Sequence, residues 1–345
     1  MRNRPYIWNL LLPLFISLMA ASCESVLFIE LEESDKLIVL NGTLGKDSTV
    51  MVQISRTRHI LDNAAIEPLG NATVNLYKRG NLLEQLNYMG EGYYRAASYQ
   101  PGVGEELTIE VEAEGYPPVS ARCEIPEIVG ITSVDTATVI QEFEEYSYTY
   151  SIESFQMDVS LHDPPGVENF YLLNLEVNKS YTSWRDTTYQ FIDSLYHNGE
   201  WHYYVADTSY TTTDTFRYVE QAHISSPDLV VEAQTDQGIL FSDQLIDGRE
   251  YSVRVFTNLG SVRSADSAVV HIRLHSISES YYKYLKTRQK HYETKEDPFA
   301  VPVIVYTNVE SGTGFLGGYS SDVKSIITFV PEFDDEYWYY QYYNE

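Results

Sequence analysis

The sequence contains little cysteine and little positive charge. Its 345 residues include two Cys, 23 Lys and Arg, and 50 Asp and Glu, which gives a formal net charge of −27. So acidic a surface repels nucleic acid phosphate and anionic lipid headgroups, and we expect no nucleic-acid partner.

Local patterns of catalytic and metal sites are also missing. Neither His-Glu-x-x-His nor Gly-x-Ser-x-Gly occurs. The histidine pairs His197/His202 and His271/His275 have no third ligand nearby, which favours structural roles. Gly312–Gly317 matches the dinucleotide fingerprint in letters, but another strand pattern follows it, which favours a turn or bulge. We therefore predict no catalytic residues, no metal and no cofactor.

Long apolar runs are confined to the N-terminus. Arg2 and Arg4 precede the apolar run 10–16, and small residues stand just before Cys23. A transmembrane anchor or a plain secretory signal are the alternatives, but the run is interrupted and shorter than the roughly 20 residues of a spanning helix. We predict a lipoprotein signal peptide over residues 1–22, removed to leave lipid on Cys23.

The predicted mature chain has a single thiol. Losing two arginines and no acid changes the net charge to −29, and Cys123 is left without an intramolecular disulfide partner. Val119, Ala121, Cys123 and Ile125 alternate with polar residues, which predicts a buried structural cysteine on one strand face.

Residues 36–126, after an acidic tether over 23–35, show short alternating runs separated by turn signals. They predict a mostly β protein that opens with an immunoglobulin-like or prealbumin-like sandwich domain. A hairpin is expected at Gly90-Glu91-Gly92. The seven predicted strands are 37–44, 49–55, 72–77, 82–88, 92–97, 107–112 and 119–125.

A second, larger β-rich domain is predicted over 127–331. The polar, aromatic stretch 179–215 indicates a projecting hairpin or long loop. Ser276 and Glu279 have capping-box spacing, so one helix is expected at about 278–293. Ile277, Tyr281, Leu285 and Tyr292 would form its apolar stripe. Further strands are expected at 170–177, 229–233, 251–256, 268–274, 301–306 and 323–330.

The acidic aromatic tail, residues 332–345, has more rings than one strand face can bury. It is interpreted as a contact for a partner or a sugar, or else as a free or sheet-edge tail. The candidate contact residues are Tyr337, Trp338, Tyr339, Tyr340, Tyr342 and Tyr343.

Ordered motifs suggest a family. The run Ala72-Thr-Val-Asn-Leu-Tyr, the block that begins Ser278-Glu-Ser-Tyr-Tyr, Asp297-Pro-Phe and Gly314-Phe-Leu-Gly-Gly-Tyr resemble the domain-of-unknown-function 4249 family of Bacteroidetes lipoproteins. The resemblance implies an outer-membrane lipoprotein, facing the cell exterior, that accompanies TonB-dependent receptors. It supplies no catalytic residues. Four Asp-Ser/Thr triplets also resemble a Bacteroidetes O-glycosylation sequence, with acceptors Thr136, Thr187, Ser194 and Ser267.

The sequence therefore predicts a non-catalytic, lipid-anchored binding protein of the outer membrane. The leading hypothesis is an accessory subunit of a TonB-dependent receptor barrel. The alternative is a stand-alone surface lipoprotein that binds a glycan or a peptide, or acts as an adhesin.

Overall fold

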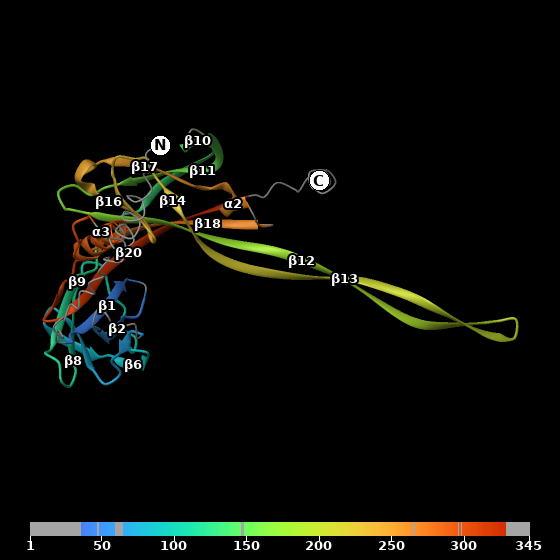
Figure 1. The fold of residues 1–345 in the computed structure, drawn as a ribbon, viewed down its shortest axis with the longest axis horizontal. Coiled ribbons are helices and arrows are strands. Elements are labelled where there is room, and N and C mark those ends of the chain that lie inside the picture. The colour runs from blue at the N-terminus through green and yellow to red at the C-terminus, as the bar shows by residue number, and fades with distance from the viewer. Residues whose placement is uncertain are drawn as a thin grey trace, which may run out of the picture. The chain divides into compact units, whose positions relative to one another are not determined.

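The computed structural model describes residues 36–46, 48–58, 65–145, 148–263, 265, 267–295, 297 and 299–328. This part of the chain is mostly β, as predicted, and its strands form three sheets (Figure 1). The strands are β1 (Ile38–Gly45), β2 (Met51–Arg56), β3 (Glu67–Pro68), β4 (Thr73–Lys78), β5 (Asn81–Gln85), β6 (Asn87–Gly90), β7 (Tyr93–Arg95), β8 (Glu106–Glu112), β9 (Val119–Glu124), β10 (Ile131–Glu145), β11 (Tyr148–His162), β12 (Phe170–His197), β13 (Glu200–Ala222), β14 (Ile224–Ser225), β15 (Val231–Thr235), β16 (Gly238–Ser242), β17 (Glu250–Asn258), β18 (Ser267–Ile277), β19 (Val309–Glu310) and β20 (Thr313–Thr328). The helices are η1 (Asp243–Leu245), α2 (Leu259–Arg263) and α3 (Glu279–Thr294).

The N-terminal strands enclose the first core. β1, β2 and β7 belong to an 11-stranded sheet, and β4, β8 and β9 belong to a five-stranded sheet. Alternation along β8 explains the packing, because Leu107, Ile109 and Val111 are fully buried while Glu110 and Glu112 point to solvent. Cys123 lies in this core, on the predicted face of β9. Burial raises the pKa of its thiol to about 12, so it stays protonated and packs as a small apolar group.

A second core lies between strands of the large sheet and a four-stranded sheet, β10-β11-β17-β14. From the large sheet, β12, β16 and β18 contribute buried residues that include Leu173, Phe241 and Ile272. From the other sheet, β11 contributes Met157 and Val159, which have no exposed surface. This part of the chain is therefore also built as two packed sheets.

The helix α3 is present where the sequence predicts it, but its start differs. Ser278 is the N-cap, and its Oγ accepts hydrogen bonds from the N–H groups of Tyr281 (3.4 Å) and Gly318 (3.0 Å). The predicted cap Ser276 was wrong: it lies buried in β18, where its Oγ accepts from the Val129 N–H (3.1 Å). Tyr292, predicted on the apolar stripe, is 52% exposed.

β20 joins the early and late parts of the chain. It pairs in parallel with β1 and antiparallel with β18, so strands from both predicted domains share the large sheet. Val309 and Leu316 complete the first core. The glycines of β20 let its backbone approach β9 closely, since a Cβ on Gly318 would lie 2.0 Å from the Glu124 carbonyl oxygen. The domain boundary after Pro126 remains a prediction.

Three strand predictions needed correction. The run 82–88 is two strands in different sheets, because buried Leu86 lies where the chain passes from β5 to β6. Residues 301–306 form no strand, and Val301 and Ile304 are over 80% exposed, so this run has no buried face. The last strand begins at Thr313, ten residues before the predicted Val323, because its glycines lie inside the strand.

Candidate functional site

The longest hairpin of the described residues is formed by β12 and β13. Every residue from Leu175 to His197 pairs with a residue of β13, ending at His197–Glu200. Asn198 and Gly199 both have positive φ, at 53° and 85°, as a two-residue type I′ turn requires. The hairpin predicted within 179–215 is therefore confirmed, and its strands twist around each other along their length (Figure 1).

Support from the sheet ends partway along this hairpin. β18 pairs with β12 as far as Ser180, and β16 pairs only with residues 170–173. From Ser183 to Asp214, the paired strand in the described structure is the other half of the hairpin. We call residues 183–214 the arm. None of its residues belongs to a described core cluster.

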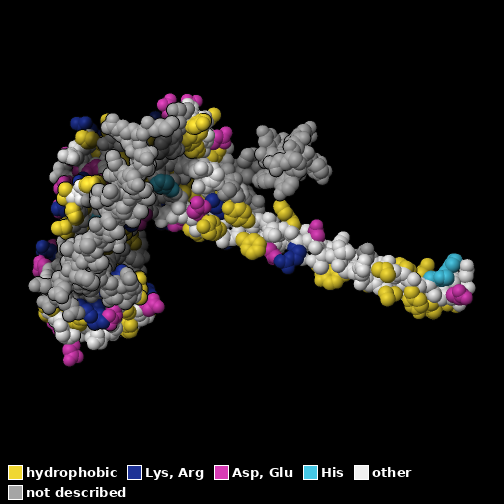
Figure 2. Space-filling view, in the orientation of Figure 1, with side chains coloured by type: hydrophobic (Ala, Val, Ile, Leu, Met, Phe, Trp, Pro, Cys, Tyr) yellow, Lys and Arg dark blue, Asp and Glu magenta, His cyan; other side chains and the backbone are white. Residues whose placement is uncertain are grey.

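The arm exposes large apolar side chains, seen as yellow patches in Figure 2. Its eight described aromatic residues are between 47% and 71% exposed. Since each aromatic side chain covers about 150–250 Å², together they present on the order of 800 Å² to solvent, divided between the two faces of the ribbon. The exposed large residues are Trp184, Tyr189, Phe191, Ile192, Leu195, Tyr196, Trp201, Tyr203, Tyr204, Val205 and Tyr210.

These residues lie on both faces of the ribbon, because directly paired residues share a face and neighbours alternate. Face A carries Tyr189, Phe191, Leu195, Tyr204 and Tyr210. Face B carries Trp184, Ile192, Tyr196, Trp201, Tyr203 and Val205.

Rings on each face contact one another. On face A, Tyr189 and Tyr210 stack with centroids 5.2 Å apart, and the Tyr204 hydroxyl donates to Asp193 (3.0 Å). That bond and the carboxylate charge raise the pKa of Tyr204. On face B, Tyr196 and Trp201 lie 5.1 Å apart. Both faces therefore present ordered aromatic pairs.

The arm carries charge of one sign over most of its length. Acids stand at every seventh position, 186, 193, 200, 207 and 214, and tyrosines repeat with the same spacing at 189, 196, 203 and 210. Residues 186–216 contain no Lys or Arg. This spacing and the Asn198-Gly199 pair are the sequence signals that our reading of the sequence missed.

The predicted modification sites are spread over three strands. Thr187 and Ser194 lie on β12 within the arm, Thr136 lies on β10 and Ser267 on β18. Three of them are exposed and Thr187 is half-buried. Their glycosylation remains a prediction. Cys23 and the candidate contacts Tyr337, Trp338, Tyr339, Tyr340, Tyr342 and Tyr343 lie outside the described residues.

The histidine pair His271/His275 shares one face of β18, because the two residues are four apart on one strand. Each Nδ1 bonds a serine of β20, Ser325 at 2.7 Å and Ser321 at 2.6 Å. Each Nε2 meets an asparagine amide of β12, Asn178 at 2.9 Å and Asn174 at 3.2 Å. Both rings therefore cross-link three strands.

A pocket of about 490 Å³ lies at the N-terminus of α3, beside Phe170, Glu232, Asp243, Tyr282 and Lys286. The Lys286 ammonium bonds Glu232 and lies over the Tyr282 ring, 5.1 Å from its centroid. Most of the polar wall is thus already paired.

Asp243, together with Asp163 and Asp247, forms the cluster of described residues whose oxygens could hold a cation, since one oxygen of each lies within 4.8 Å of the others. Burial, then the charges of Asp163 and Asp247, raises the pKa of Asp243. Main-chain N–H groups of Gly248 (3.0 Å), Asn169 (2.8 Å) and Gly166 (2.8 Å) already bond the three carboxylates. The cluster therefore also ties three loops together.

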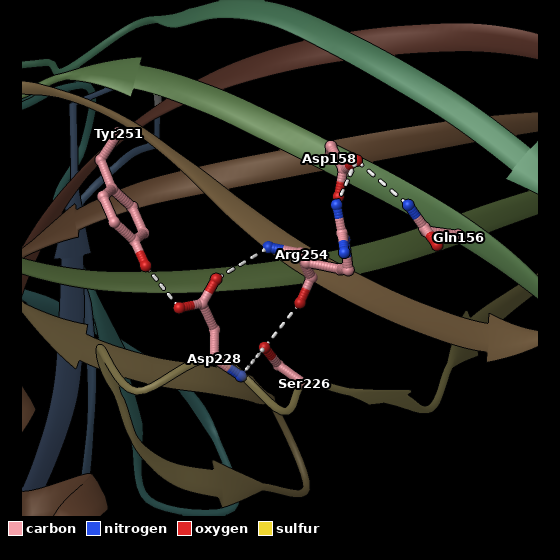
Figure 3. Close-up of polar contacts among 6 residues, drawn as sticks. All are labelled: Gln156, Asp158, Ser226, Asp228, Tyr251 and Arg254. Atoms are coloured by element: carbon pink, nitrogen blue, oxygen red, sulfur yellow. Dashed lines mark hydrogen bonds and ion pairs between the residues drawn. The ribbon is translucent and has the colours of Figure 1, made fainter.

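Another polar cluster lies between β11, β17 and the loop after β14 (Figure 3). Arg254 donates from Nε and Nη2 to Asp158 (2.7 and 3.1 Å), which holds the pKa of that carboxyl below its usual value. Asp228 accepts from the Tyr251 hydroxyl and from the Arg254 N–H, and Ser226 donates to the Arg254 carbonyl. These side chains bond one another, which assigns them a structural role.

No helix among the described residues is long and apolar enough to cross a membrane.

The fold and the arm define a mostly β protein with a two-stranded ribbon that exposes aromatic residues on both of its faces. The chain belongs to the family described as Domain of unknown function (DUF4249), whose model matches residues 24–325. Among curated proteins, none matches the chain.

Proposed function

We propose that this protein is a non-catalytic lipoprotein of the bacterial outer membrane, anchored by lipid on Cys23 and facing the cell exterior. It acts as an accessory binding subunit of a TonB-dependent receptor complex. The observation that carries the proposal is the arm, whose exposed aromatic surface is about the 800 Å² that one partner contributes to a standard interface.

Physical reasoning supports a binding role for this surface. A two-stranded hairpin is marginally stable alone in water, and the largest exposed apolar patches of a protein are often interaction sites. Tyrosine and tryptophan contribute large contact areas at low entropic cost and are enriched among residues that dominate binding energy. Membrane attachment would add to this affinity by confining the arm near its partner.

The test is extraction of the full-length protein from its native membrane in mild detergent. We expect a barrel protein to co-purify in near-equal amount. A variant that lacks residues 185–196 and 201–212 has a shortened arm but keeps the pairs Trp184–Thr213 and His197–Glu200 and the same turn. We expect the amount of co-purified partner to fall at least about tenfold.

The matched control is Leu229→Ser, which removes an 89% exposed side chain outside the arm and should retain the partner. Recovery of the wild-type protein as a lone monomer would overturn the proposal.

The stacked Tyr189–Tyr210 pair favours a second candidate, a stand-alone glycan-binding lipoprotein. The stacked rings offer an apolar platform for a sugar, and the Asp193 carboxylate, four residues farther along β12 on the same face, offers a hydrogen-bond acceptor. This candidate predicts that the isolated soluble protein is retained on immobilised surface glycan and that Tyr189→Ala and Tyr210→Ala abolish retention.

A further inference from the structure

The distal part of the arm, residues 189–205, exposes large apolar side chains on both faces. Phe191, Leu195 and Tyr204 lie on face A, and Ile192 and Trp201 lie on face B, with exposed fractions of 47–74%. A strand ribbon that rests on a flat surface hides one face and leaves the other in water. Only an enclosing surface covers both.

The charge of the arm narrows the class of partner. Residues 186–216 contain five acids and no Lys or Arg. A second copy of the arm would bring like charges together, and an anionic membrane surface would repel it. Carboxylates beside aromatic rings instead suit Arg and Lys, which pair with the acids and lie over the rings.

We propose that the distal arm inserts into a recess of a partner protein, which contacts both faces and presents Arg or Lys to the arm's carboxylates. This inference rests on the proposed function, because it specifies how the accessory subunit holds its partner. Trp184 and the threonines at 211–213 lie closer to the sheet and form the entrance of the contact.

Photo-cross-linking in intact cells tests the two faces separately. The full-length protein carries p-benzoylphenylalanine in place of Phe191 for face A or of Ile192 for face B. A control protein carries p-benzoylphenylalanine in place of Leu82, an exposed residue of β5 in another sheet, and measures background cross-linking. We expect both arm positions to cross-link to the same protein, at different peptides located by mass spectrometry.

A cross-link from one face alone would indicate a flat contact and overturn the inference. So would cross-links to a second copy, to lipid, to residues 329–345 of the same chain, or to nothing. Loss of the partner on shortening the arm, combined with a one-face cross-link, would refute the enclosing recess and leave the proposed function standing.

Neutralising the acids tests the charge component. The triple variant Asp186→Asn, Glu200→Gln and Asp214→Asn keeps both apolar faces intact. We expect about fivefold or greater loss of co-purified partner at low salt and a weaker dependence of recovery on NaCl concentration. Unchanged recovery with unchanged salt dependence would overturn the assignment of Arg or Lys to the partner.

Discussion

At the scale of single residues, His275 shows how a neutral histidine is built into the sheet. Its Nε2 faces Nδ2 of Asn174, an NH₂ group that can only donate, so the ring accepts there and donates from Nδ1 to Ser321. Burial, and then the charge of Arg273, lowers the pKa of His275 to about 4. Geometry and electrostatics therefore agree on the neutral ring.

This residue makes the folded state sensitive to acid. Unfolded histidine binds a proton below about pH 6.5 and folded His275 only below about 4, so stability falls as the pH drops through that window. We expect His275 to account for a loss of up to about 2 kcal/mol between pH 7.5 and 5. Urea denaturation of the wild type and of His275→Gln at both pH values measures it.

The test compares how much unfolding free energy each of the two proteins loses between pH 7.5 and 5. Wild type should lose more stability than His275→Gln on acidification, and equal losses would assign the acid sensitivity to other groups.

Some residue roles were predictable from sequence and others were not. The buried side of Val119–Ile125 follows from a period of two alone, and so does the shared face of His271 and His275. The helix cap was not predictable in the same way, because Ser276 and Ser278 both suit an N-cap. The choice between them depends on the strand ending at Ile277, and pairing with β20 and β12 sets that end.

At the scale of elements, the arm is separable from the cores. It contributes no residue to a described core cluster and pairs only with itself beyond Ser183. Removing residues 185–196 and 201–212 should therefore change the free energy of unfolding of the rest of the protein by less than about 1 kcal/mol. Urea denaturation followed by far-ultraviolet circular dichroism tests this.

A contrasting variant gives the comparison. Gly318→Ala places a methyl group against the Glu124 carbonyl and should cost about 1–3 kcal/mol. An arm deletion as destabilising as this substitution would show that the arm supports the fold.

Elements differ in how well the sequence defines them. Strands with one buried face, such as β8, β9 and β17, were predicted to within two or three residues, but β11, which has the same alternation, was not predicted. The stretch 179–215 was predicted as a projecting hairpin or long loop, but the pairing of its strands was not, since neither face of the arm is buried and a burial pattern is absent. The candidate site was therefore mostly missed. Four of its residues were named for other reasons, Thr187 and Ser194 for their Asp-Ser/Thr triplets and His197 and His202 as a histidine pair.

At the scale of the whole molecule, one cysteine is predicted to hold the protein at the membrane. Cys23→Ser should move the protein from the membrane fraction to the soluble fraction and abolish incorporation of a labelled fatty acid. Cys123→Ala is the control. Because Cys123 is buried in β9, this substitution should leave the membrane fractionation unchanged. Membrane retention of the Cys23 variant would contradict the lipid anchor.

The pairing of β1 with β20 sets an order of events during biosynthesis. The first core lacks Val309 and Leu316, and β1 lacks its parallel neighbour, until β20 has left the ribosome. Contacts this distant in sequence slow folding and leave strand edges open meanwhile. The nascent chain would therefore leave part of its first core open until β20 has been synthesised.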